Sequence, residues 1–151
     1  MKFKKLYTLL KKQKHSIRGF PNNELRELGR TKVTAMVTAQ IIENFYTSVE
    51  TLFLRISQFF ENSLNKDKWH KDLLGKMALH IEGVRDRVIT EATYKDLTEL
   101  LQFRHFKRYY FELEYDWDKL DFLTGKLEAQ FKKLPGELNK FITFLDKSLK
   151  V

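Results

Sequence analysis

The segment from residue 103 to residue 113 combines side chains that bind phosphate with one that moves protons. Its sequence, FRHFKRYYFEL, holds two arginines, one histidine and two tyrosines. An arginine guanidinium holds phosphate oxygens in a planar fork, and a histidine gains or loses a proton near neutral pH. These residue types suit phosphodiester chemistry, and they make Arg104, His105 and Arg108 the first candidate site residues.

Helical spacing divides this segment into two faces. Apolar side chains three or four positions apart predict one buried stripe, formed by Leu100, Phe103, Phe106, Tyr110 and Leu113. The same spacing leaves the polar residues on flanking and opposite faces: Arg104, His105, Arg108, Tyr109 and Glu112. The alternative is a core helix with a solvated basic face and no chemical role.

The composition is typical of one folded domain. The chain has 151 residues, 42% of them hydrophobic and 14% aromatic, enough to bury a core without metal or disulfide cross-links. It has no cysteine, which excludes disulfides and thiolate metal sites. Its first residues form only a short apolar stretch interrupted by lysines, unlike a signal peptide, and no apolar run approaches the ~20 residues of a membrane span. We therefore expect a cytoplasmic protein without membrane association.

Basic residues gather at the N-terminal end. The net charge is +8, and seven of the 28 Lys and Arg residues lie before residue 19 with no acidic residue among them. We therefore divide the chain into a basic N-terminal segment, 1–20, expected to be helical, and a helical bundle domain, 21–151. The basic segment either contacts an RNA backbone or forms the solvated face of a first helix. The apolar spacing of Phe3, Leu6 and Leu9 favours the second interpretation.

The rest of the chain has helical patterning throughout. Asn23 is the expected N-cap of a long helix whose apolar stripe runs from Val37 to Phe60, and Pro135-Gly136 is expected to kink or break the last helix. The expected elements are a helix over about 24–62, a polar loop over 62–68, a helix over 69–77, a connector over 80–93, the motif helix over 94–113, and a last helix capped by Asp116. This pattern predicts an all-α, single-domain antiparallel helical bundle.

The sequence lacks the common catalytic signatures. It has no glycine-rich phosphate loop and no His-Glu-x-x-His pattern, and its four histidines are dispersed. The acidic residues between Glu112 and Asp121 are expected to cap a helix and to balance the charges of Arg104 and Arg108. We therefore predict no metal site and no cofactor.

Several blocks, taken in order, resemble one known family. They are Glu43–Glu50 (ENFYTSVE), Trp69–Leu74 (WHKDLL), Gly83-Val84-Arg85, and Phe103–Arg108 (FRHFKR) followed by Glu112-Leu113 and Asp116-Trp117. Together they resemble the HepT-like proteins, the toxin side of a bacterial toxin–antitoxin system in the HEPN superfamily, over about residues 24–148. The resemblance implies a dimeric helical bundle, a metal-independent ribonuclease activity and a minimal nucleotidyltransferase as antitoxin partner.

The family's catalytic motif is matched only in part. That motif is an arginine, four residues, a histidine, one residue and a tyrosine. Laid on this chain from Arg104, it places Tyr109 at the histidine position and Phe111 at the tyrosine position. Metal-free RNA cleavage needs a group that exchanges protons near pH 7, which histidine does and an unshifted tyrosine, with a pKa of about 10, does not. His105, beside the arginine, is the available substitute.

The resemblance therefore implies a set of site residues. They are the catalytic residues Arg104, His105 and Tyr109 and the RNA-binding residues Arg104, Lys107 and Arg108. The family's antitoxin adenylylates the motif tyrosine, which is Phe111 here, so such a modification is expected at Tyr109 or Tyr110. Positions 104 and 109 lie about 140° apart around one helix, so a homodimer is expected to form a shared cleft. The alternative function is a catalytically inactive HEPN-type scaffold that keeps the fold and the partner interface.

Overall fold

The computed structural model describes residues 5, 8, 22–60, 64, 67–109 and 115–150. These residues form five helices: α2 (Asn22–Glu27), α3 (Lys32–Phe60), α4 (Trp69–Met77), α5 (Glu91–Tyr109) and α6 (Trp117–Leu149). The described part contains no strand, only one isolated β-bridge between Ile81 and Arg85. The predicted all-α bundle is confirmed. Of the basic segment 1–20, only Lys5 and Thr8 are described, both helical, so its predicted helix stays a prediction.

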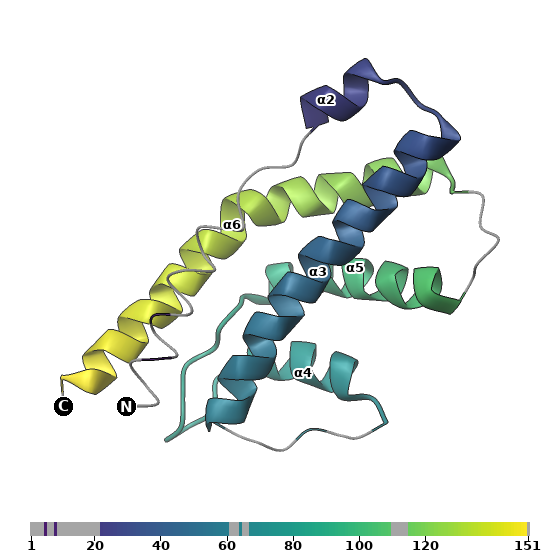
Figure 1. Ribbon diagram of the computed structural model, residues 1–151. Coiled ribbons are helices and arrows are strands. Elements are labelled where there is room, and N and C mark those ends of the chain that lie inside the picture. The colour runs from purple at the N-terminus through teal and green to yellow at the C-terminus, as the bar shows by residue number, and fades with distance from the viewer. Residues whose placement is uncertain are drawn as a thin grey trace.

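The two longest helices, α3 and α6, lie side by side and run in the same direction (Figure 1). Phe45 of α3 contacts Phe131 of α6, with ring centroids 5.2 Å apart. Further along both helices, the ring centroids of Phe60 and Phe141 are 6.1 Å apart. The core of the bundle therefore lies along this parallel pair, and the sites described below are built on it.

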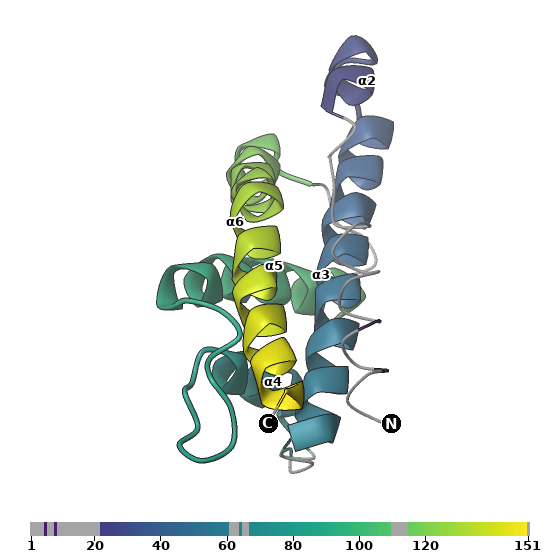
Figure 2. The ribbon, with the colours of Figure 1, turned by 90° about the vertical axis from the view of Figure 1, so that its left-hand side faces the viewer.

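Helix α5 crosses the parallel pair, as the turned view in Figure 2 shows. Near the start of α5, the Thr93 hydroxyl donates to Glu137 of α6 at 2.5 Å. Further along α5, Glu99 lies 3.8 Å from Lys119, which is near the start of α6. The direction of α5 is thus antiparallel to that of α6, as the bundle prediction required, and α6 is parallel to α3 because α5 reverses the chain between them.

Gly29 divides the predicted long helix into α2 and α3. Its φ of +78° is a conformation that glycine adopts at helix ends, and its N–H donates to the carbonyl of Arg26 at 3.2 Å. Thr31 then caps α3: the Thr34 N–H donates to Thr31 Oγ1 at 3.1 Å, and the Thr31 N–H donates to Thr34 Oγ1 at 2.8 Å. Asn23, predicted to be the cap, lies inside α2, so that prediction is wrong.

The buried face of α3 differs from the predicted stripe at its start. Ala35, Ala39 and Ile42 are buried there, whereas Val37, which began the predicted stripe, is 41% exposed. The stripe from Phe45 to Ile56 is buried as predicted, and its last residue, Phe60, is partly buried. None of the described helices combines the length and the apolar character that a membrane span requires.

Helix α5 begins at Glu91, earlier than the predicted residue 94. The Thr93 N–H donates to Thr90 Oγ1 at 3.3 Å, which satisfies one of the unpaired donors of the first turn. The carboxylate of Glu137 accepts a further bond from the Thr90 N–H at 2.7 Å. A tertiary contact from α6 thus completes the helix start, and the local sequence alone did not show it.

Arg85 holds the connector against the C-terminal end of α4. Its side chain is fully buried, and its guanidinium donates to the carbonyls of Lys76, Leu79 and Asp86 at 2.9, 3.0 and 3.1 Å. The last carbonyls of a helix lack partners within that helix. Arg85 supplies a partner for one of them, the carbonyl of Lys76, and so ties the end of α4 to the connector.

Asp116 caps α6 as predicted, since its Oδ1 accepts from the Asp118 N–H at 2.9 Å. The helix continues through Pro135 to Leu149 and bends along its length (Figure 1). A proline inside a helix removes one hydrogen bond. The fully buried side chains of Leu134 and Leu138 on either side of the proline hold the helix together there.

Candidate functional site

Arg104 lies on the buried face of α5, so its predicted place on a flanking face is wrong. That buried face runs through Leu97, Leu100 and Arg104, and Arg104 is only 7% exposed. Phe106, predicted to lie in the buried stripe, is instead 44% exposed. The prediction followed apolar residues alone, whereas a charged residue takes a buried position when a partner of opposite charge compensates it.

Glu50 of α3 is that partner, and it joins Arg104 to His70 of α4. Arg104 Nη1 donates to Glu50 Oε1 at 2.9 Å, and His70 Nδ1 lies 2.7 Å from Glu50 Oε2. Glu50 is 5% exposed, while the side chain of His70 is 34% exposed. One buried carboxylate therefore orients a guanidinium and an imidazole that belong to two other helices.

The bond to Glu50 also fixes the proton on the His70 ring. An ionised carboxylate only accepts hydrogen bonds, so the proton of the neutral imidazole sits on Nδ1. The Nε2 atom then carries the lone pair and is the ring nitrogen that accepts a proton. The indole of Trp69 stacks on the imidazole with ring centroids 3.6 Å apart, which holds the ring plane in place.

Tyr46 lies beside the ion pair, one helical turn before Glu50. It is buried, and the guanidinium carbon of Arg104 is 5.9 Å from the centroid of its ring. Burial, reinforced by the charge of Glu50 and opposed by that of Arg104, raises the pKa of Tyr46 far above its usual value. The phenol therefore stays neutral and does not act as a base.

Lys107, one of the residues predicted to bind RNA, also pairs with α3. Its Nζ lies 2.5 Å from Glu43 Oε2 and donates to Gln40 Oε1 at 2.7 Å. Its side chain is only 17% exposed. Two of the three predicted RNA-binding residues, Arg104 and Lys107, are thus paired with carboxylates of the neighbouring helix.

His105 and His70 line the same surface cavity between α4 and α5, which has a volume of about 640 Å³. His105 itself is exposed. We call this the histidine cavity and define it by His70 and Lys71 of α4 and by Tyr94, Thr98, His105 and Phe106 of α5. One solvent-accessible cavity is therefore lined by two histidines from separate helices and by a lysine.

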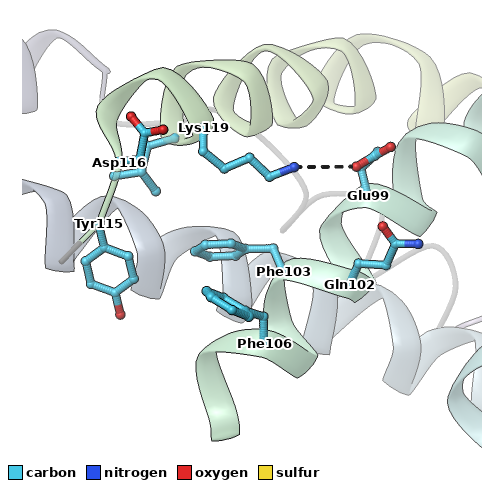
Figure 3. A pocket seen from close by; sticks show the side chains of 8 residues that line it. Glu99, Gln102, Phe103, Phe106, Tyr115, Asp116 and Lys119 are labelled. Carbon is cyan, nitrogen blue, oxygen red and sulfur yellow. Dashed lines mark ion pairs between the residues drawn. The ribbon is translucent and has the colours of Figure 1, made fainter. Parts of the chain in front are cut away.

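A second cavity of about 540 Å³ lies between α5 and α6. Figure 3 shows the rings of Phe103, Phe106 and Tyr115 around it, with the ion pair of Lys119 and Glu99 at its edge. We call it the aromatic cavity. None of the described residues that line it is a histidine or an arginine. Of the two cavities, the histidine cavity is therefore the better candidate for proton transfer near neutral pH.

Several predicted site residues lie at the end of α5. Tyr109 is its last described residue, and the side chains of Arg108 and Tyr109 are outside the described part of the structure. Tyr110 and Glu112 also lie outside it. The roles predicted for these residues stay predictions.

Sequence analysis missed Glu50 as a site residue. The charge of Arg104 was expected to be balanced from the acidic run between Glu112 and Asp121, but Glu50 balances it, and Asp121 pairs with Arg30 at 2.7 Å. The available signal was position: Glu50 lies one turn after Tyr46 on the apolar stripe, where a carboxylate is rare unless it has a partner.

A metal ion needs several ligating side chains close together. Among the described residues, no group of three His, Cys, Asp or Glu side chains lies close enough together to hold a metal ion.

Comparison with known proteins identifies a family. The sequence model of a family described as HepT-like protein matches residues 37–145, which include Glu50, His70, Arg104 and His105. No curated protein and no solved structure matches the chain.

Proposed function

The chain belongs to the HepT-like protein family, and we propose that it is a toxin-side protein that cleaves RNA without a metal ion. The observation that carries the proposal is the exposed His105 in the wall of the histidine cavity, which Lys71 of α4 also lines. Histidine transfers protons near pH 7, and a lysine neutralises phosphate charge. The cavity therefore offers the two functions that metal-free phosphodiester cleavage needs.

In this proposal, Arg104 is a positioning residue. Its Nη1 is held by Glu50 and its side chain is almost fully buried, so it does not reach a phosphate while that pair is intact. Its charge instead pairs with Glu50 and holds that carboxylate in place. RNA contact through Arg108 stays part of the proposal, together with the positive net charge of the chain.

Incubation of the purified protein with total RNA or tRNA in EDTA tests the proposal. We expect cleavage by the wild type and by His80→Ala, a control that removes an exposed histidine of the connector. We expect a loss of cleavage with His105→Ala. Cleavage that His105→Ala retains in full indicates a contaminant or another site.

The alternative function is a catalytically inactive HEPN-type scaffold, and one observation favours it. Arg104 is the only residue that matches the family's catalytic motif, and its guanidinium is bound to Glu50. Tyr109 stands at the position of the motif histidine. If the wild type cleaves no RNA, alone or with its partner, the scaffold function is supported instead.

The proposal includes a minimal nucleotidyltransferase as antitoxin, which adenylylates Tyr109 or Tyr110. These are the only hydroxyl-bearing residues between Arg104 and Leu113. Co-expression with such a nucleotidyltransferase and addition of ATP, followed by intact-mass and fragment spectra, checks this step. AMP mapped to any other residue rejects the site, and co-purification without added mass indicates neutralisation by binding alone.

A homodimer is also part of the proposal. The exposed Phe106 and the aromatic cavity beside it give α5 an apolar outer surface that a second copy is able to cover. Light scattering coupled to size exclusion is expected to give twice the 18.1 kDa chain mass. A monomer at all concentrations tested rejects this part of the proposal.

A further inference from the structure

We propose that His70 is a second catalytic residue, which takes the proton from the RNA 2′-hydroxyl while His105 protonates the leaving oxygen. This inference rests on the ribonuclease function proposed above and gives it a second proton-transfer group. It is carried by a juxtaposition: a histidine that a buried carboxylate orients lines the same cavity as the exposed His105.

The first argument is the way His70 is held. Glu50 Oε2 accepts from His70 Nδ1 at 2.7 Å, while the other oxygen of Glu50 is fixed by Arg104 at 2.9 Å. The Trp69 indole stacks on one face of the ring. A histidine that only fills space on an apolar face does not need a buried carboxylate as its partner. This arrangement instead resembles the general one in which a carboxylate selects the tautomer of a catalytic imidazole.

The second argument is the division of roles between the two histidines. With Nδ1 bound to Glu50, the neutral ring of His70 has its lone pair on Nε2, so His70 begins the reaction as the proton acceptor. Glu50 then stabilises the imidazolium that forms on His70. His105 is exposed, and this exposure gives it the proton exchange with solvent that an acid needs.

The reaction that follows is balanced without a metal ion or an external reagent. His70 Nε2 takes the proton as the 2′-oxygen forms a bond to phosphorus. The bond between phosphorus and the 5′-oxygen breaks, and the 5′-oxygen receives a proton from His105. The products are a 2′,3′-cyclic phosphate and a 5′-hydroxyl end, and exchange with solvent returns both histidines to their starting forms.

The walls of the histidine cavity indicate single-stranded RNA as the substrate class. Lys68 and Lys71 lie beside His70 and supply positive charge for a phosphate, with Asp67 as the carboxylate among the lining residues. Tyr94 and the exposed Phe106 present rings in the same cavity, and an unpaired base stacks on such rings. A base that is held in a duplex does not reach them.

The closing experiment uses a DNA oligonucleotide with one ribonucleotide, cleaved in EDTA, with the product ends measured by mass spectrometry. His70→Asn is the key variant, because the asparagine amide keeps a donor near the Nδ1 position for Glu50 but has no counterpart of Nε2. His80→Asn is the matched control, because His80 is an exposed histidine of the connector whose Nδ1 lies 3.3 Å from Asp86. Circular dichroism establishes that each variant is folded.

We expect His70→Asn to lower kcat about 100- to 10,000-fold, with a cyclic phosphate as the product of the wild type and no loss in His80→Asn. Glu50→Gln, whose amide donates to Nδ1 and so moves the proton to Nε2, is expected to lower kcat with little change in KM. This split distinguishes a positioning role from loss of RNA binding.

A second substrate separates the acid from the base. When sulfur replaces the bridging 5′-oxygen, the leaving group departs without a proton, so this substrate is expected to restore cleavage by His105→Ala but not by His70→Asn. Rescue of His70→Asn, or His70→Asn activity equal to that of His80→Asn, overturns this inference while the ribonuclease function stands. No cleavage by the wild type overturns both.

Discussion

Replacement of Glu50 by leucine is expected to destabilise the fold strongly, because it leaves the guanidinium of Arg104 buried without a counter-charge. Glu50 and Arg104 have side chains only 7% and 8% exposed, and their atoms are 2.9 Å apart. Loss of one member of such a buried pair costs about 3–5 kcal/mol. At about 2–4 °C per kcal/mol for a chain of this size, the melting temperature is expected to fall by about 6–20 °C.

The double variant Glu50→Leu/Arg104→Met is expected to recover most of this loss, because two apolar side chains of similar size then replace the pair. Some cost remains, since His70 loses its acceptor. Guanidinium unfolding of the wild type, both single variants and the double variant gives the coupling free energy. The exposed pair of Arg30 and Asp121 is the control, and Asp121→Ala is expected to cost less than about 1 kcal/mol.

Two results contradict this reasoning. A Glu50→Leu variant within about 1 kcal/mol of the wild type shows that the pair is solvated in solution and that the burial of Arg104 is wrong. A double variant as unstable as the sum of the two single variants shows that the two side chains do not interact.

Three further predictions concern other parts of the chain. Because the pKa of Tyr46 is raised in the folded state, its contribution to stability is present below the unfolded-state pKa of about 10 and is lost as the pH rises above that value. Tyr46→Phe is therefore expected to make the free energy of unfolding less dependent on pH above pH 10. An unchanged slope of that free energy against pH contradicts this prediction. Thr31→Ala removes the cap of α3 and is expected to cost about 0.5–2 kcal/mol in guanidinium unfolding, so an unchanged midpoint rejects that cap. Deletion of residues 2–18 is expected to lower the melting temperature and to leave RNA affinity unchanged; a weaker affinity with a flatter salt dependence shows instead that the segment binds RNA.

The sequence predicted the helices well where apolar spacing dominates. The stripe from Phe45 to Ile56, the cap at Asp116 and the start of α4 at Trp69 agree with the structure. One error lies at a helix end that needs a distant partner. The start of α5 depends on Glu137, which is far away in the sequence, and no local pattern indicates that contact.

The candidate site was predictable in part. His105 was identified from its residue type, and it does line a cavity. The burial of Arg104 was not predicted, because an arginine among polar neighbours was taken to be solvated. Its true place depends on Glu50, 54 positions earlier, and the pairing of two charges so far apart appears only when α3 and α5 are packed together.

The most direct test locates the RNA-binding site by NMR. The four histidines are labelled with ¹³C at Cε1, and their signals are followed as RNA is added. The ligand is a short RNA with a 2′-deoxy sugar at the scissile position, which binds without cleavage, in a buffer with EDTA. If the histidine cavity is the reactive site, the signals of His70 and His105 shift together and saturate at one ligand concentration, while the signal of His80 does not move. Binding that shifts neither His70 nor His105 contradicts the central claim.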